Sequence, residues 1–188
     1  SQPMTMLETF TKDRKYLQVI SGSLFSPFAL AARTDVMNYA QTNVRLGWML
    51  NSPPPSKSFL RGNVEAIFEL SNSIIYKGSG NYIGGFSTLF RYNFIQPDGK
   101  LIPYIQAGAG VVYTDAYKDR SQTAIGQAIE FTPQASLGLH YLIRTNWSIE
   151  AEAMFHHISN ADLDERNHGI NAFGGFMGLT YYFDMPLK

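Results

Sequence analysis

The sequence predicts an all-β protein, an eight-stranded antiparallel transmembrane β-barrel, and three observations lead to this prediction. Apolar and polar residues alternate almost without interruption from about residue 16 to residue 183, as in strands with one apolar face. Only 16% of the 188 residues are charged, and 14% are aromatic. The lysines lie in expected turns, loops or ends and never inside a strand, although strand surfaces that face water normally carry lysine. A barrel whose strands turn their apolar faces to lipid accounts for the alternation, the composition and the positions of the lysines.

The first four expected strands differ in how clearly their two faces are divided. The first is ambiguous because it has apolar residues on both faces. In the second, Trp48 and its apolar neighbours oppose Arg45, and in the third, Phe68 and its neighbours oppose Glu69. In the fourth, the aromatic face that includes Phe90 opposes a polar face. The expected ranges of these strands are 16–26, 42–50, 59–76 and 82–95.

The last four expected strands continue the alternation to the end of the chain. The fifth contains Gly108 and Gly110, which relieve crowding or permit bending in a barrel strand. In the seventh, Ile149 and Phe155 share an apolar face that opposes Glu150. In the eighth, apolar and aromatic residues oppose glycine and threonine. The expected ranges are 101–117, 128–143, 147–160 and 170–183.

The charged residues of the strands are arginine and glutamate, which suit ion pairing inside a closed lumen filled with side chains. The residues expected to face inward include Arg45, Arg61, Glu65, Glu69, Arg91 and Glu150. The residues expected to face outward include Val64, Phe68, Phe90, Leu137, Leu139 and Leu179. The alternative is a soluble eight-stranded barrel of the lipocalin kind, which is apolar inside and polar outside.

The connections predict a bacterial outer-membrane barrel whose termini face the periplasm, because short turns at one end and longer loops at the other are typical of that class. The short ones are 51–57, 96–100 and 144–146, and the longer ones are 27–41, 118–127 and 161–169. The short connection 77–81 is the exception. Residues 1–15 form an N-terminal leader of unknown structure, and residues 16–188 form the outer-membrane barrel domain.

Composition excludes several other classes of protein and site. The formal net charge is zero, so nothing favours binding to nucleic acid. The chain has no cysteine, which excludes disulfides and thiolate metal sites. No run of 18 apolar residues predicts a membrane-spanning helix. The four histidines make no recognisable zinc site, and we expect neither a metal nor another cofactor.

The end of the seventh strand carries the candidate chemistry. Residues two apart in a strand point the same way, so His157 and Ser159 project together from the apolar, lipid-facing side. Asn171, at the start of the eighth strand, has the same parity. Polar residues on a lipid-facing surface are costly and therefore suggest function. Taken alone, the His-x-Ser spacing is also compatible with interfacial polar residues on a barrel rim.

These residue types in this arrangement suggest ester hydrolysis. A serine hydroxyl needs an adjacent base, here His157, and a third group must fix the imidazole tautomer. Donors near Ser159 must stabilise the oxyanion, and Asn160 and Asn167 are the candidates.

The stretch from His157 to Ala161, followed by Asn167 and Gly169, resembles the outer-membrane lipid A 3-O-deacylase family, PagL-type acyloxyacyl hydrolases. The specific part of the resemblance is the last 35 residues or so, and a looser likeness extends upstream to about residue 16. The resemblance implies an eight-stranded barrel that removes an ester-linked acyl chain from lipid A in the outer leaflet. By position, it makes Ser159 the nucleophile and His157 the base. The family's acid falls on Asn171, which can accept a hydrogen bond but carries no charge.

The remaining histidines and loop cations have secondary roles. His156 has lumen parity and is expected to bind a carboxylate such as Glu150 or Glu152, His140 also faces the lumen, and His168 lies in a loop. The loop cations Lys118, Arg120 and Arg166 are candidates to hold lipid phosphates.

Two functions follow from these expectations. The first is a serine carboxylic-ester hydrolase that acts on lipid A or another outer-leaflet lipid. The alternative is a non-catalytic outer-membrane barrel of the same descent, a structural or partner-binding subunit with a protein partner. Asn171 in the acid position favours the alternative.

Overall fold

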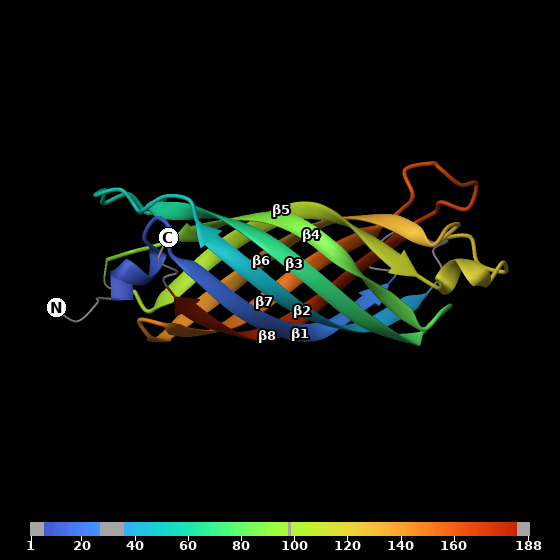
Figure 1. Cartoon of the computed structure of the whole chain (residues 1–188), viewed down its shortest axis with the longest axis horizontal. Coiled ribbons are helices and arrows are strands. Elements are labelled where there is room, and N and C mark those ends of the chain that lie inside the picture. Colours follow the sequence, from blue (N-terminus) through green and yellow to red (C-terminus); the bar gives the residue numbers. More distant parts are fainter. Residues whose placement is uncertain (1–5, 27–35, 98, 184–188) are drawn as a thin grey trace, which may run out of the picture.

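The computed structural model describes residues 6–26, 36–97 and 99–183, which form a closed barrel of eight antiparallel strands (Figure 1). The predicted fold class is therefore confirmed. The strands are β1 (Lys15–Ser26), β2 (Met37–Met49), β3 (Gly62–Lys77), β4 (Tyr82–Phe94), β5 (Leu101–Thr114), β6 (Ile129–Arg144), β7 (Trp147–Ile158) and β8 (Ile170–Phe183). Two short 3-10 helices, η1 (Met6–Phe10) and η2 (Ala116–Lys118), complete the described structure. Among the described residues, no helix is long and apolar enough to cross a membrane.

The outer wall of the barrel is apolar, as the alternation predicts. Each strand pairs with its neighbours in sequence, and β8 closes the barrel against β1 from Lys15↔Phe183 to Phe25↔Phe173. Exposed outward residues include Phe68, Phe90, Leu137, Leu139 and Leu179, while Val64 is half-buried. The soluble, lipocalin-like alternative is wrong because that barrel would be polar outside.

The lumen is filled by buried charged side chains. Arg45 pairs with Glu69 at 2.6 Å and with Glu152 at 2.9 Å, and Arg91 pairs with Glu65 at 3.0 Å. All five side chains are almost fully buried, so each charge requires the partner that it has. The predicted inward positions of Arg45, Glu65, Glu69 and Arg91, and of Glu150, are confirmed.

Apolar clusters lie at both ends of this charged middle. At one end, Phe10 of η1 is fully buried and contacts the rings of His140 and Tyr182. At the other end, Ala124 and Ile125 of the β5–β6 loop pack into a cluster of inward strand residues. The same end carries the β7–β8 loop, drawn in orange in Figure 1. The β5–β6 loop is therefore anchored inside the barrel, next to the loop that carries the candidate site.

Several predicted boundaries are wrong in detail. β2 begins at Met37, which is five residues earlier than expected, because it stays paired with β1 as far as the register pair Ser26↔Met37. β3 begins only at Gly62, so Arg61 lies outside the strand. Its guanidinium donates to the main-chain oxygens of Pro54 and Ile95, both at 2.8 Å. The inward position predicted for Arg61 is therefore wrong.

Other differences concern the loops and ends. β5 ends at Thr114, before η2, and β7 ends at Ile158. Residues 1–5 of the expected leader and most of the expected loop 27–41 lie outside the described residues.

Candidate functional site

His157 and Asn171 face each other across β7 and β8. They are register partners, and His157 Nδ1 lies 2.6 Å from Asn171 Oδ1. An amide oxygen only accepts, so this contact puts the imidazole proton on Nδ1 and leaves the lone pair of Nε2 free. Both side chains are half-buried on the outer wall. The arrangement fixes the orientation of the imidazole through an amide, without a carboxylate.

Ser159 follows β7 directly and lies on the same side as His157. Its backbone forms two hydrogen bonds with Phe131 of β6, at 2.7 and 3.0 Å, which extend the β6–β7 pairing by one bridge. Among the described residues, no hydrogen bond joins the Ser159 hydroxyl to His157. The backbone position of Ser159 is therefore fixed, while its hydroxyl must turn to reach a base.

Gly169 lies beside both His157 and Ser159. A Cβ atom placed on Gly169 would be 3.2 Å from His157 Cε1 and 3.7 Å from Ser159 Cβ. The φ angle of Gly169 is +74°, in the left-handed region where glycine is favoured. Gly169 therefore leaves room for the imidazole next to Ser159.

Asn160 and Asn167 are also brought together, and they brace the start of the β7–β8 loop. The Asn160 N–H donates to Asn167 Oδ1 at 2.8 Å, and Asn160 Nδ2 donates to the Arg166 carbonyl at 3.1 Å. Between them, Ala161 and Asp162 have φ angles of 53° and 63°, and the Leu163 N–H donates to the Asn160 carbonyl at 3.1 Å. The Asn160 N–H must exchange its present acceptor before it can bind an oxyanion.

The β5–β6 loop supports the other end of the β7–β8 loop. The N–H groups of His168 and Gly169 donate to the carbonyls of Thr123 and Ala124, at 3.2 and 3.0 Å. Gln122, which is buried, donates to the Ile125 carbonyl at 2.6 Å and accepts from the Ile125 N–H at 2.8 Å. The buried part of the β5–β6 loop, from Gln122 to Gly126 apart from exposed Thr123, thus supports Gly169 beside His157.

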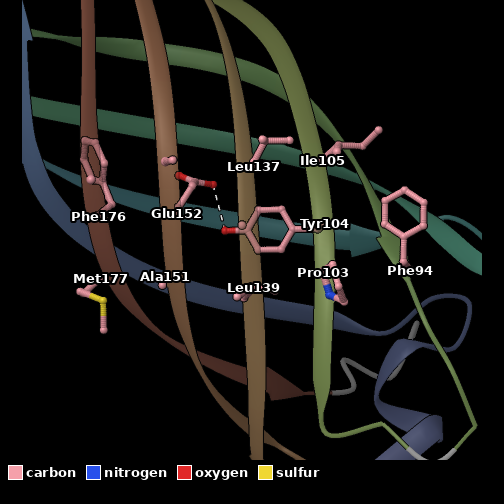
Figure 2. Close-up of a pocket in the computed structure, with 13 residues that line it drawn as sticks. Phe94, Pro103, Tyr104, Ile105, Leu137, Leu139, Ala151, Glu152, Phe176 and Met177 are labelled. Atoms are coloured by element: carbon pink, nitrogen blue, oxygen red, sulfur yellow. Dashed lines mark hydrogen bonds between the residues drawn. The ribbon is translucent and has the colours of Figure 1, made fainter.

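An apolar groove lies on the outer wall below the site. It has a volume of about 710 Å³ and is lined mainly by outward residues of β5 to β8, with Phe94 at one side (Figure 2). In the β7–β8 register, Ala153 pairs with Gly175, four residues below the pair of His157 and Asn171. A Cβ atom on Gly175 would meet nothing within 4 Å, so the floor of the groove is open there.

No carboxylate of the described loop residues binds His157. Asp162 Oδ1 accepts from Asn167 Nδ2 at 2.8 Å, and Asp164 Oδ1 accepts from the Arg166 N–H at 2.9 Å. Hydrogen bonds from the Ser121 and Ser79 side chains lower the pKa of Asp119 to about 2. Asp119, Asp162 and Asp164 therefore each bind a group of the loops and not His157.

The neighbouring loop acid, Asp115, has a similar structural role. Burial raises its pKa, but hydrogen bonds from Asn81 and Tyr82 outweigh burial and lower it overall.

The remaining histidines serve the structure. His156 Nδ1 lies 2.6 Å from the Tyr39 hydroxyl, so the predicted contact with Glu150 or Glu152 is wrong. His140 faces the lumen as predicted, and its Nδ1 lies 3.0 Å from Glu150 Oε1.

His168 is exposed, and its Nδ1 lies 3.0 Å from the Thr123 hydroxyl. Within the described ranges, no group of three or more histidine or acidic residues is arranged to hold a metal ion.

Sequence reasoning missed two supports of the site. Gln122 gave no signal, because a glutamine in a polar loop is ordinary and its role depends on the folded loop. Gly169 had a signal, since it ends a polar loop just before an apolar strand, where a left-handed residue is common. Its contact with His157, however, depends on the register of β7 and β8.

Comparison with known proteins gives one family and several solved structures that share the barrel fold. A model of the family described as lipid A 3-O-deacylase (PagL) matches residues 40–180. The crystal structure of the outer membrane enzyme PagL is 19% identical, with a TM-score of 0.57, and the match covers 87% of this chain and 97% of that one. No curated protein sequence matches the chain.

Two other crystal structures share the barrel fold. Neisserial surface protein A (NspA) is 12% identical, with a TM-score of 0.65 and coverage of 90% of this chain and 97% of that one. The N-terminal β-barrel domain of OprF from Pseudomonas aeruginosa is 13% identical, with a TM-score of 0.55 and coverage of 92% and 98%. Identities this low show the fold alone.

Proposed function

Because the chain belongs to the lipid A 3-O-deacylase (PagL) family, we propose that it is an esterase that hydrolyses an ester-linked acyl chain of lipid A. The protein is a β-barrel of the bacterial outer membrane. The observation that carries the proposal is the 2.6 Å contact between His157 Nδ1 and Asn171 Oδ1, which orients a base beside Ser159 on the lipid-facing wall.

The reaction begins when the Ser159 hydroxyl turns toward His157 Nε2. His157 takes the hydroxyl proton while the serine oxygen attacks the ester carbonyl. The tetrahedral intermediate collapses, His157 gives the proton to the departing sugar oxygen, and an acyl-serine remains. Water, activated by His157 in the same way, then releases the fatty acid. Asn171 keeps the proton of the resting imidazole on Nδ1, but it offers no charge to the imidazolium.

The oxyanion requires hydrogen-bond donors, and the candidate donors already bind other groups in this structure. The Asn160 N–H is bound to Asn167 Oδ1, and one hydrogen of Asn167 Nδ2 is bound to Asp162. When Asn167 turns away from Asn160, the Asn160 N–H is released beside Ser159. A small movement of the β7–β8 loop on substrate binding thus supplies the donor, and donors fixed in a site of low polarity stabilise the developing charge strongly.

The groove below the site suits the acyl chain of the substrate. Ala153 and Gly175 lie four residues below His157 and Asn171, which is about 13 Å along a strand. Gly175→Leu fills open space and should lower the hydrolysis of long-chain esters, while hydrolysis of a short ester such as butanoate persists. Ala40→Leu is the matched control: Ala40 pairs with Ser23, which pairs with Gly175, and it does not line the groove.

Mass spectrometry of lipid A tests the proposal directly. The full chain, folded in outer-membrane lipid, should release one fatty acid from lipid A, and Ser159→Ala should abolish the release. Ser21→Ala removes another outward hydroxyl, whose partner is Thr42, and should leave the activity unchanged. If the parent chain releases no fatty acid while it is folded, the enzyme proposal fails.

The second candidate function is a non-catalytic barrel of the same descent. Asn171 in the acid position and the missing hydrogen bond between the described side chains of Ser159 and His157 favour it. In that case neither Ser159→Ala nor His157→Ala would change any property of the outer membrane lipid, and the loop end of the barrel would bind a protein partner.

A further inference from the structure

A second, polar pocket lies at the loop end of the barrel. It has a volume of about 710 Å³ and is lined by Tyr117, Lys118, Arg120 and Gly126 of the β5–β6 loop and by residues 164–166 of the β7–β8 loop. Polar surface predominates in its lining, in contrast to the apolar groove on the outer wall. Its residues come from both loops that surround the candidate site.

Arg166 joins the two loops and shapes this pocket. Its guanidinium donates to the main-chain oxygens of Tyr117 at 2.9 Å and Asp119 at 3.1 Å, with longer contacts to Gly126 and Gln122 at 3.3 and 3.5 Å. These acceptors are neutral carbonyls. The wall is therefore built before any ligand binds, and Arg166 forms no ion pair within the described part of the chain, although its charge helps to lower the pKa of the nearby Asp119.

Lys118 and Arg120 add two more positive charges. Both side chains are exposed, and neither forms an ion pair with another residue in the part of the chain that the structure describes. Asp119 lies between them in sequence, but its carboxylate accepts from the Ser79 and Ser121 side chains, both at 2.6 Å. The two cations are free to bind an anion.

The pocket also contains groups that a simple anion site would avoid. Asp164 and Glu165 line it together with the half-buried ring of Tyr117. Carboxylates accept hydrogen bonds from hydroxyl groups, cations bind phosphate, and an aromatic ring offers a flat apolar face with a polar tip. We propose that this pocket binds the phosphorylated sugar headgroup of a glycolipid, with Lys118 and Arg120 on the phosphate and the two carboxylates on sugar hydroxyls.

The pocket is close to the candidate nucleophile. The Arg166 carbonyl accepts from Asn160 Nδ2 at 3.1 Å, and Asn160 follows Ser159 in the chain. A headgroup held here and an acyl chain held in the outer-wall groove would present the ester between them. The inference deepens the proposed function, on which it rests for the presence of an ester, but headgroup binding is measured without turnover.

The test measures binding to full-length Ser159→Ala protein folded in detergent micelles. The probes are monophosphorylated lipid A, its dephosphorylated form, glucosamine phosphate and inorganic phosphate. Lys118→Gln should weaken binding of the phosphorylated lipid about threefold, and Lys118→Gln with Arg120→Gln about tenfold, which is the range of exposed ion pairs. Lys77→Gln is the matched control, since Lys77 is an exposed lysine at the same end that does not line the pocket.

Four results would overturn the inference. These are no binding of the phosphorylated lipid, an equal loss in Lys77→Gln, an equal loss for the dephosphorylated lipid, and inorganic phosphate competing as well as glucosamine phosphate. The last would leave a phosphate site without sugar recognition. Hydrolysis of a short ester by the parent chain is measured separately, so that failure of headgroup binding and failure of the esterase proposal are distinguished.

Discussion

Asn171 is the residue on which the proposed chemistry depends most. It accepts from His157 Nδ1 at 2.6 Å and so supplies orientation without charge. Asn171→Glu keeps an acceptor at this position and adds a negative charge that stabilises the imidazolium. We expect the hydrolysis rate to rise about tenfold, or roughly 1.4 kcal/mol in the barrier.

The comparison variant for this test is Asn171→Leu, which removes the acceptor and should lower the rate below that of the parent. Rates are measured as fatty-acid release from lipid A by the protein folded in lipid. Equal rates for the parent, Asn171→Glu and Asn171→Leu would show that Asn171 does not orient the base.

Gly169 is the second residue whose substitution tests how the site is positioned. In Gly169→Ala, the new methyl group would lie 2.9 Å from the Ile158 carbonyl oxygen and 3.2 Å from His157 Cε1, at a φ angle of +74°. The left-handed conformation costs alanine about 1–2 kcal/mol, and relief of the contact displaces the imidazole. We expect kcat for ester hydrolysis to fall more than KM rises, as measured in steady-state kinetics.

Gly99→Ala is the control for this variant, because its methyl group would have only ordinary contacts, at 3.5 Å or more. If Gly169→Ala changes KM alone, or if Gly99→Ala has the same effect, Gly169 does not position the base.

Each strand of the barrel has one face toward lipid and the other toward the charged lumen. In β3, Phe68 is outward and stacks on Phe86, while its neighbour Glu69 is inward and pairs with Arg45. Phe68→Arg places a charge in lipid and should cost about 2–4 kcal/mol. Glu69→Gln keeps an acceptor, and Arg45 keeps Glu152, so the loss should be about 1.5 kcal/mol, one charge-assisted hydrogen bond.

Urea unfolding of the protein in lipid vesicles measures both values. Phe68→Leu is the control for lost stacking and should cost less than either. If Glu69→Gln costs more than Phe68→Arg, the lumen network and not the lipid-facing wall dominates stability in this part of the barrel.

The strands were predictable from sequence because lipid on one side and a charged lumen on the other impose a period of two on every strand. Their ends were less predictable. Leu60 continues the alternation by chance, but Phe59 and Leu60 both belong to the turn before β3, because Gly62 is where pairing with Phe94 begins. Conversely, β2 extends back to Met37 because it pairs with β1 up to Ser26, and this register is not visible locally.

The candidate site was predictable only where strand parity controls it. Parity put His157 and Asn171 on one face, and the structure brings them together. The contact of His156 with Tyr39 crosses the lumen between strands that are distant in sequence. The sequence alone therefore could not show which buried side chain His156 contacts. The catalytic roles of Ser159, His157, Asn171, Asn160 and Asn167 stay predictions.

At the scale of the whole molecule, the two ends of the barrel differ. η1 lies at one end, and the β5–β6 and β7–β8 loops, with the candidate site between them, lie at the other (Figure 1). An enzyme that acts on an outer-leaflet lipid requires the loop end at the cell surface. Lys118 is exposed at the loop end, and Lys100 is exposed in the turn before β5 at the opposite end.

The chain contains no cysteine, so single cysteines can report this orientation without background. In intact cells, a membrane-impermeant maleimide should label Lys118→Cys and leave Lys100→Cys unlabelled, whereas both should react after the membrane is dissolved. The buried lumen charges leave no open path for the reagent through the barrel, since Arg45 and Arg91 and their partners fill its middle. Labelling of Lys100→Cys alone in intact cells would show that the barrel has the opposite orientation, with the loop end facing the periplasm. Ser159 would then face the inner leaflet, and lipid A could not be the substrate.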